Sequence, residues 1–278
     1  MKIEDLHHAS SLGGGWRTHL NDRRVSESTS GAALSEIVPA SEGQWHLWLE
    51  LNRISFLAAA LEGCIHINTV TNPLVVLDAD STTLQDEVIE LIADAAGSRK
   101  EVAEITDRAM RGEIDFVQSL RARVRTLEGL PVQALHDVVE KVRPTPGIRE
   151  LSDAVHARNG VVGVVSGGFH EILDRVLPDL GIDIWAANRL EVIDEKLTGE
   201  LYGPIIDAQA KADTLRQWSI MSGIPLDRSI AIGDGANDLL MMEIAGLSIA
   251  FNAKPIVQER ADVSVSDNLA GIIPHLSR

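Results

Sequence analysis

Three polar segments of the sequence hold the residue types that catalysis uses, and each follows a short apolar run. The first reads Asp78-Ala79-Asp80-Ser81-Thr82 and follows the run at 74–77. Two carboxylates two residues apart on an extended segment point the same way, so one could act as nucleophile and the other as general acid or base. The alternative is a solvated turn before a helix, because Asp, Ser and Thr are the residues that N-caps prefer.

The second and third segments could bind an anion and a cation. Ser166-Gly167-Gly168 follows the run at 161–165, and a hydroxyl with free backbone N–H groups at a helix start can bind an anion. An ordinary glycine turn is the simpler interpretation. Gly233-Asp234-Gly235-Ala236-Asn237-Asp238 follows the run at 229–232. Two carboxylates and an amide suit Mg²⁺, which takes one or two carboxylates plus phosphate oxygens, although a capped loop is again the alternative.

Alternating strands and helices must position these segments. Strands buried on both faces are typical of short apolar runs, and such runs lie at 74–77, 161–165, 229–232 and 247–251. Long helical patterns separate the first two runs, with breaks near 97, 112 and 129–131. This order predicts an α/β fold with a parallel sheet and helices on both faces. Ligands bind at the carboxyl ends of such strands, where all three segments lie, and their combined chemistry describes phosphoryl transfer.

The composition limits the class of protein. The chain has 278 residues, a formal charge of −16, 45% hydrophobic residues and a single cysteine, Cys64. One cysteine excludes a disulfide framework, and the acidic balance argues against a nucleic-acid partner, which needs a basic face. No stretch reaches the ~18 apolar residues of a membrane span, and residues 1–20 lack a signal-peptide pattern. We therefore expect a soluble, cytoplasmic protein without a membrane partner.

Together with Lys211, the three segments resemble the four motifs of haloacid dehalogenase-type phosphatases, and among these the phosphoserine phosphatases. The likeness spans about residues 73–276. It implies a Rossmann-like parallel sheet with helices on both faces, in a phosphatase domain at 71–278. A helical-bundle cap at about 84–144 would be inserted after the first strand. Residues 1–70 lie outside the likeness and form an extension of unassigned fold, for which a regulatory role is one hypothesis.

The resemblance implies a role for each residue that matches the catalytic motifs. Asp78 would be the nucleophile that becomes an aspartyl-phosphate, and Asp80 would protonate the leaving oxygen and then deprotonate water. Mg²⁺ would be held by the carboxylates of Asp78 and Asp234 and by the backbone carbonyl of Asp80. Asp238 would orient Lys211. The residues expected to hold the phosphate oxygens are Ser166, Gly167, Lys211 and Asn237.

Four residues of the cap region complete the resemblance. Glu87 would pair with the ammonium of an amino-acid substrate and Arg123 with its carboxylate, while Met110 and Phe116 would exclude water. Without the motif register, Glu87 and Arg123 would be ordinary solvated helix charges. A cap that excludes water must also open to release product, and the segments 82–84 and 143–147 are the expected hinges.

The expected activity is Mg²⁺-dependent hydrolysis of O-phospho-L-serine to L-serine and phosphate, the last step of serine biosynthesis. A related phosphatase or phosphotransferase for phosphothreonine or phosphohomoserine is one alternative, because one methylene discriminates weakly. A phospho-accepting signalling module is another, although such modules lack a long helical insertion after the first strand. The partner is expected to be a small molecule, and a homodimer is left open.

Overall fold

The computed structural model describes residues 72–277, apart from the side chain of Met110. The predicted extension at 1–70 lies outside the described residues. Seven strands form one sheet in the order β4-β3-β2-β1-β5-β6-β7, parallel except for the antiparallel pair β3 and β4. The strands are β1 (Leu74–Leu77), β2 (Val161–Phe169), β3 (Ile184–Ile193), β4 (Lys196–Tyr202), β5 (Ser229–Gly233), β6 (Leu247–Phe251) and β7 (Val263–Val265). The predicted α/β class is therefore confirmed.

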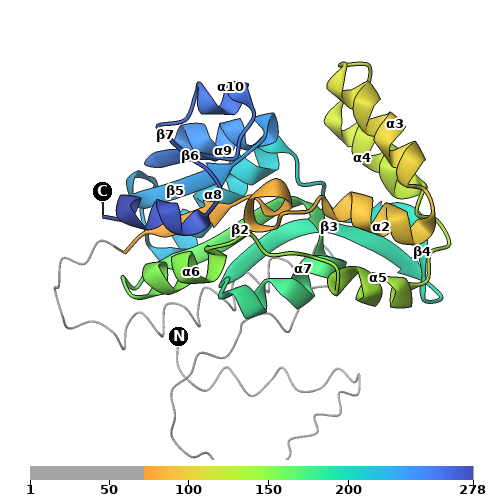
Figure 1. Cartoon of the computed structure of the whole chain (residues 1–278), viewed down its shortest axis with the longest axis horizontal. Coiled ribbons are helices and arrows are strands. Elements are labelled where there is room, and N and C mark those ends of the chain that lie inside the picture. The colour runs from red at the N-terminus through yellow and green to blue at the C-terminus, as the bar shows by residue number, and fades with distance from the viewer. Residues whose placement is uncertain (1–71, 278) are drawn as a thin grey trace, which may run out of the picture. The chain divides into compact units, whose positions relative to one another are not determined.

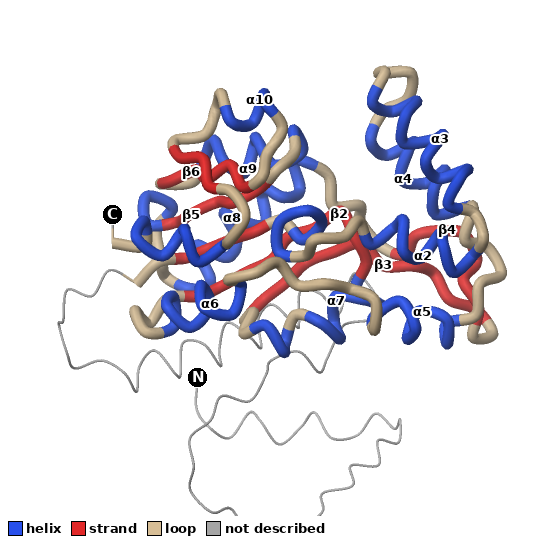
Figure 2. The backbone as a smooth tube through the Cα atoms, in the orientation of Figure 1, coloured by secondary structure: helices blue, strands red, loops and turns tan. Residues whose placement is uncertain are grey.

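Helices cover both faces of this sheet (Figures 1 and 2). Two apolar clusters hold them there. One joins the sheet to α6 and α7 and to the first helices after β1, and the other joins it to α8 and α9. Among residues 72–277, no helix combines the length and apolar character that crossing a membrane requires. The helices are α2 (Val88–Ala96), α3 (Arg99–Met110), α4 (Phe116–Arg125), α5 (Val132–Val139), α6 (Ile148–His156), α7 (His170–Val176), α8 (Ala208–Ser222), α9 (Leu239–Ile244) and α10 (Pro255–Gln258).

The four apolar runs form the four central parallel strands, as predicted, and β1 lies in the middle of the sheet. All four residues of β1 are fully buried, which a strand covered by helices on both faces requires. The structure differs from the expectation at β2, which continues through the glycine segment to Phe169. Its pairing with β3 shifts register between Val165 and Phe169, so the predicted end of the strand is a bulge inside it.

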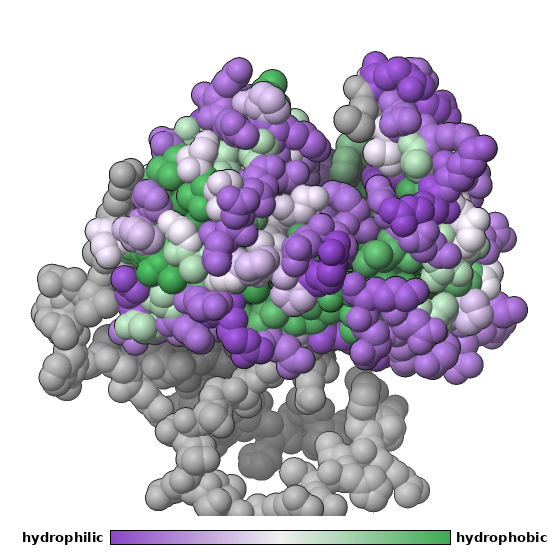
Figure 3. Space-filling model, viewed as in Figure 1, coloured by the Kyte–Doolittle hydropathy of each residue, from purple (hydrophilic) through white to green (hydrophobic). Residues whose placement is uncertain are grey.

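Helices α2 to α5 form the predicted helical cap between β1 and β2. The breaks between these helices fall at Gly97, Gly112 and Gly129, whose φ angles of 73°, 75° and 83° lie in the left-handed region that glycine tolerates. Figure 3 shows that the visible surface of α3 and α4 is mostly polar, as expected for helices that project from the core. The linkers to the cap pair with each other through an antiparallel bridge between Leu84 and Pro144.

The cap is also joined to the β3–β4 hairpin by backbone hydrogen bonds. The amide of Gly129 donates to the carbonyl of Leu197 over 2.8 Å, and the amide of Leu197 donates to Leu130 over 2.9 Å. The amide of Val132 donates to Glu195 over 2.9 Å. The segment before α5 therefore extends the sheet beyond β4, and this side of the cap is fixed to the core.

Candidate active site

Asp78 directly follows β1, and its backbone is held from two sides. Its amide donates to the carbonyl of Ile232 over 2.9 Å, and its carbonyl accepts the Thr83 hydroxyl over 2.6 Å. The chain then makes a tight turn at 79–83, in which Ser81 takes a left-handed φ of 56°. Asp78 is 4% exposed, and its Oδ1 accepts the Ala79 amide. This geometry presents a fixed carboxylate at the carboxyl end of the central strand.

Lys211, from the first turns of α8, lies between two carboxylates. Its Nζ is 2.7 Å from Asp78 Oδ1 and 2.8 Å from Asp238 Oδ1, and all three side chains are buried. Burial alone would lower the pKa of Lys211, but the carboxylates of Asp238 and Asp78 raise it above its ordinary value. Lys211 is therefore a permanent cation beside the nucleophile candidate.

Three carboxylates lie close enough to hold a metal ion. Ligand oxygens of Asp78, Asp234 and Asp238 lie within 4.8 Å of one another. Burial and the Asp238 charge raise the pKa of Asp234 to about 6, and burial and Asp238 also raise the pKa of Asp78, although Lys211 opposes this. Such mutual repulsion fits a site for a divalent cation, which prefers carboxylate oxygens.

The metal candidates are not equivalent, because both oxygens of Asp238 already have partners. Oδ1 accepts from Lys211, and Oδ2 accepts the Gly235 amide over 3.1 Å. A Cβ at Gly233 would lie 2.4 Å from Asp238 Cγ, so only glycine allows this close packing. Asp78 and Asp234 therefore have the better geometry for a cation, and Asp238 orients the lysine.

Asp80 has the environment of an acid–base group. Its Oδ1 accepts the Val88 amide at the start of α2 over 3.0 Å. Burial and the nearby Glu87 charge raise the pKa of Asp80 to about 7, which is near the value that suits proton transfer at neutral pH. A Cβ at Gly168 would lie 3.0 Å from Ser166 Oγ and 3.4 Å from Asp80 Oδ2. Asp80 therefore lies beside Ser166, in the segment that is predicted to bind an anion.

Ser166 and Gly167, which we call the phosphate seat, lie within the bulge of β2. Ser166 is fully buried, and its Oγ accepts the Gly168 amide over 2.8 Å. The cap closes against Gly167, since a Cβ there would lie 3.3 Å from Phe116 Cζ. Phe116 thus packs over the seat, and its role in excluding water stays a prediction.

Two opposite charges of the cap face the same region. Glu87 Oε1 accepts the Ser81 hydroxyl over 2.9 Å, which ties it to the nucleophile turn. Burial lowers the pKa of Arg123, while the charges of Glu87 and Asp80 oppose this, so Arg123 lies within electrostatic reach of both carboxylates. A carboxylate and a guanidinium at one end of the site can bind a zwitterion.

The remaining two predicted residues are less fully defined. Asn237 lies in the loop after β5, where a Cβ at Gly235 would be 2.4 Å from its Oδ1. Met110 is the last residue of α3, and its side chain lies outside the description. The predicted roles of Asn237 and Met110 stay predictions.

Two groups that shape the site were not among the predicted residues. The Thr83 hydroxyl fixes the Asp78 carbonyl, and the Val88 amide binds Asp80. The first amides of a helix have no partner inside the helix. A helix that starts directly after Glu87 therefore indicated that the Val88 amide was free to bind Asp80. The Thr83 contact depends on the tight turn and had no signal in the sequence.

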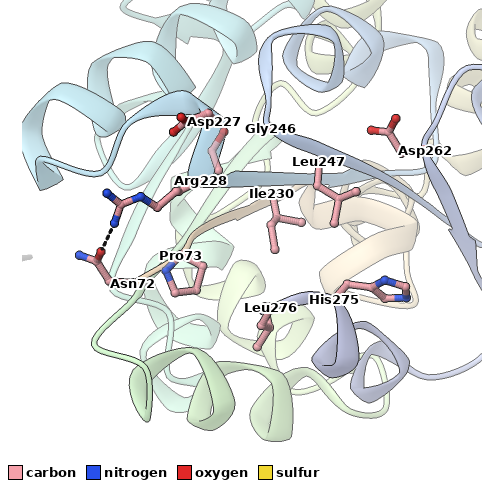
Figure 4. A pocket seen from close by; sticks show the side chains of 11 residues that line it. Asn72, Pro73, Asp227, Arg228, Ile230, Gly246, Leu247, Asp262, His275 and Leu276 are labelled. Carbon is pink, nitrogen blue, oxygen red and sulfur yellow. Dashed lines mark hydrogen bonds between the residues drawn. The ribbon is translucent and has the colours of Figure 1, made fainter. Parts of the chain in front are cut away.

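A separate cavity of about 220 Å³ lies at the other end of the sheet (Figure 4). It is lined by residues at the amino ends of strands, including Ser229 and Leu247, and by Arg228, which donates to Asn72 over 3.1 Å. Because Asp78 follows the carboxyl end of β1, this cavity is remote from the carboxylate cluster.

Known proteins share this arrangement. The sequence model of the haloacid dehalogenase-like hydrolases matches residues 75–243. A phosphoserine phosphatase of Streptococcus thermophilus is 50% identical over 194 residues, 70% of this chain and 90% of that one. One of Streptomyces coelicolor is 51% identical over 193 residues, 69% of this chain but only 47% of that one.

A solved structure has the same fold. It is described as a phospho-aspartyl intermediate analogue of phosphoserine phosphatase, with 41% identity and a TM-score of 0.69, and the match covers 74% of this chain and 99% of that one. The sequence match, the fold and the carboxylate–lysine cluster agree. The chain belongs to the haloacid dehalogenase-like hydrolases.

Proposed function

We propose that the chain is a phosphoserine phosphatase, which hydrolyses O-phospho-L-serine to L-serine and phosphate. One observation carries the proposal: the Asp78 and Asp80 pair lies beside Glu87 and Arg123, which carry the two charges that a zwitterionic substrate needs. The guanidinium of Arg123 can bind a carboxylate bidentately, and Glu87 is suited to an ammonium group. The relatives to which this chain is similar are named phosphoserine phosphatases, and phosphoserine is such a zwitterionic substrate.

The reaction proceeds in two displacements. An Asp78 oxygen attacks phosphorus, and the bond from phosphorus to the serine oxygen breaks while protonated Asp80 gives that oxygen its proton. Asp80, now a carboxylate, then takes a proton from water as the water oxygen attacks phosphorus and the bond to Asp78 breaks. The products are serine, phosphate and a regenerated carboxylate. The pKa of Asp80 near 7 suits both proton transfers.

The chain's own groups stabilise the phosphoryl oxygens. Phosphoryl transfer is mainly positioning and charge stabilisation. Lys211 holds its charge beside Asp78, and the Ser166 hydroxyl and the Gly167 amide supply neutral donors from the β2 bulge. We assign the fourth contact to Asn237 from its motif position. Phe116 covers the seat at Gly167.

The carboxylates of Asp78 and Asp234 and the backbone carbonyl of Asp80 would hold Mg²⁺. Bound there, it would neutralise charge on the phosphoryl group and on the carboxylates. Asp238 keeps Lys211 in place and stays outside the ligand set, because both its oxygens have partners. Location in the cytoplasm, a homodimer and the domain boundaries at 71 and at 84–144 stay predictions.

A panel of phosphate esters tests the substrate assignment. We expect phosphoserine to have the highest kcat/KM. Phosphoethanolamine, which lacks the carboxylate, and phosphoglycerate, which lacks the ammonium group, should both have a lower kcat/KM. The kcat/KM for phosphothreonine and phosphohomoserine should be lower than that for phosphoserine by ~10–200-fold at most, since a single methylene discriminates weakly. Equal kcat/KM across the panel would defeat the proposal.

Variants connect the panel to the two charges. Arg123→Gln should lose the preference for phosphoserine over phosphoethanolamine, and Glu87→Gln should lose the preference over phosphoglycerate. Arg125→Gln is the matched control, because Arg125 lies on the same helix and pairs with Glu200 at the surface. If the control changes selectivity as much as Arg123→Gln does, the assignment of Arg123 to the substrate carboxylate is wrong.

A further inference from the structure

We infer that Asn188 is a positioning residue, which holds the two phosphate-binding arms of the site in a fixed relation. One arm is the glycine bulge of β2 with Ser166, and the other is the start of α8 with Lys211. The inference rests on the proposed function only in taking these arms as the phosphate seat. Asn188 is absent from the motifs that predicted the site.

The Asn188 side chain uses both of its polar groups. It lies on β3 with 1% of its surface exposed. Its Nδ2 donates to the carbonyl of Gly167 over 2.8 Å, and its Oδ1 accepts the amide of Ile206 over 2.8 Å. The flipped amide would set oxygen against oxygen and N–H against N–H, so the two partners fix its orientation.

The bulge explains why Gly167 needs a side-chain partner. Ladder pairing holds Val165 to Ala186 and Phe169 to Asn188, which leaves residues 166–168 opposite Ala187 alone. The Ala187 amide itself is bound by the His170 ring over 3.3 Å. The Gly167 carbonyl thus lies where regular pairing is interrupted, and the Asn188 amide supplies its hydrogen bond.

This bond also orients the Ser166 hydroxyl. The Gly167 carbonyl and the Gly168 amide belong to one planar peptide group, so fixing the first fixes the second. The Gly168 amide donates to Ser166 Oγ over 2.8 Å. With that lone pair occupied, the hydroxyl keeps its proton for a phosphate oxygen.

The other half of the Asn188 amide acts on α8. Ile206 directly precedes Asp207, the N-cap of α8, whose side chain accepts the Ala210 amide over 2.8 Å. The Asp207 carbonyl accepts the Lys211 amide over 2.9 Å. Holding Ile206 therefore fixes the start of the helix that carries Lys211, and a single buried amide links both arms.

The test compares ligands that occupy different parts of the site. Inorganic phosphate probes the seat, and L-serine alone probes the Glu87 and Arg123 pair. Calorimetry on the full chain, with Mg²⁺ present, measures the affinity for phosphate. In Asn188→Ala this affinity should fall by up to ~100-fold, which is the size of effect expected when a group at a reacting centre is displaced. L-serine affinity should be unchanged, and KM for phosphoserine should rise.

Asn188→Leu separates positioning from space filling. Leucine has nearly the same shape as asparagine and adds no charge, but it neither donates to the Gly167 carbonyl nor accepts the Ile206 amide. We expect it to lose phosphate affinity, and it provides the test if the alanine variant does not fold. Ser219→Ala is the control, since Ser219 is buried on α8 and bonds the Ile224 carbonyl at the far end of the helix. It should keep phosphate affinity.

Two results would contradict different claims. Wild-type phosphate affinity in folded Asn188→Leu would overturn the positioning role, whatever the substrate. If the wild-type chain does not hydrolyse phosphoserine but its phosphate affinity still depends on Asn188, the proposed substrate is wrong and the positioning role stands.

Discussion

At the scale of single residues, a buried lysine between two carboxylates defines the site. Lys211 compensates one of the two negative charges of Asp78 and Asp238 in a site that is buried from water. The three polar segments were predictable because each follows an apolar run, whereas Lys211 lies on a helix and was identified only by its resemblance to a family motif. Thr83 and the Val88 amide were not predictable from residue type, because their roles arise from a tight turn and from the position of a helix start.

Removing the lysine charge should destabilise the chain. In Lys211→Met, Asp78 and Asp238 would face each other uncompensated, and breaking a buried ion pair in this way costs about 3–5 kcal/mol. Urea unfolding measures the loss, and added Mg²⁺ should restore part of it because a ligand that binds only the folded state stabilises it. Lys254→Met, at an exposed lysine near Asp234, is the control. Equal stability of both variants would contradict the role of Lys211.

A methyl group at Gly167 should impair closure of the cap. The added Cβ would lie 3.3 Å from Phe116 Cζ, and the φ of Gly167 is outside the left-handed region, so the backbone itself tolerates alanine. Gly167→Ala should lower kcat/KM by up to ~100-fold through displacement of the cap. Adding Phe116→Leu should recover part of the rate. No recovery in the double variant would show that Phe116 is not the obstacle.

At the scale of elements, the cap is connected to the core at more places than its two linkers. The helix boundaries of the cap followed from its glycines, and the prediction was confirmed at each break. The bonds from Gly129 and Val132 to the β3–β4 hairpin were not predictable, because they pair residues about 65 apart in sequence. The short strand β7 (Val263–Val265) also gave no distinct signal, since three residues define no period.

These bonds should restrict opening to the outer cap helices. Hydrogen exchange should show that the amides of Gly129, Leu197 and Val132 stay protected with and without phosphoserine. Segments α3 and α4 should gain protection on binding, because they lack such ladder bonds to the core. Equal ligand-dependent changes at Gly129 and within α3 would instead support motion of the whole cap about its linkers.

The two linkers also share an ion pair whose pH dependence can be measured. Arg143 Nη2 lies 2.6 Å from Asp86 Oδ1, and its hydrogen bonds lower the pKa of Asp86 below the ordinary value of 3.8. A lowered carboxylate pKa stabilises the folded chain above the ordinary pKa, and this contribution is lost as pH falls through the lowered value. NMR titration should show the Asp86 pKa rising in Arg143→Gln. An unchanged pKa would mean that the pair does not form in solution.

At the scale of the whole molecule, the charge of −16 and a phosphate ligand are compatible. The net charge sets the average field, but the seat is built from Lys211, backbone amides and a hydroxyl, with Arg123 at its cap side. The parallel sheet brings segments that are far apart in sequence to one edge, which is why strand ends predicted the site. The remote cavity at the opposite edge contributes none of these groups.

The most direct test of the proposed mechanism is to identify the residue that is phosphorylated during turnover. The full chain is mixed with O-phospho-L-serine and Mg²⁺, quenched in acid and mapped by mass spectrometry. We predict a phosphoryl group on the peptide that contains Asp78. In Asp78→Asn both the phosphopeptide and phosphate release should be absent, while Asp94→Asn, at a surface carboxylate of the cap, should retain both. A phosphoryl group on another residue, or turnover by Asp78→Asn, would show that Asp78 is not the nucleophile.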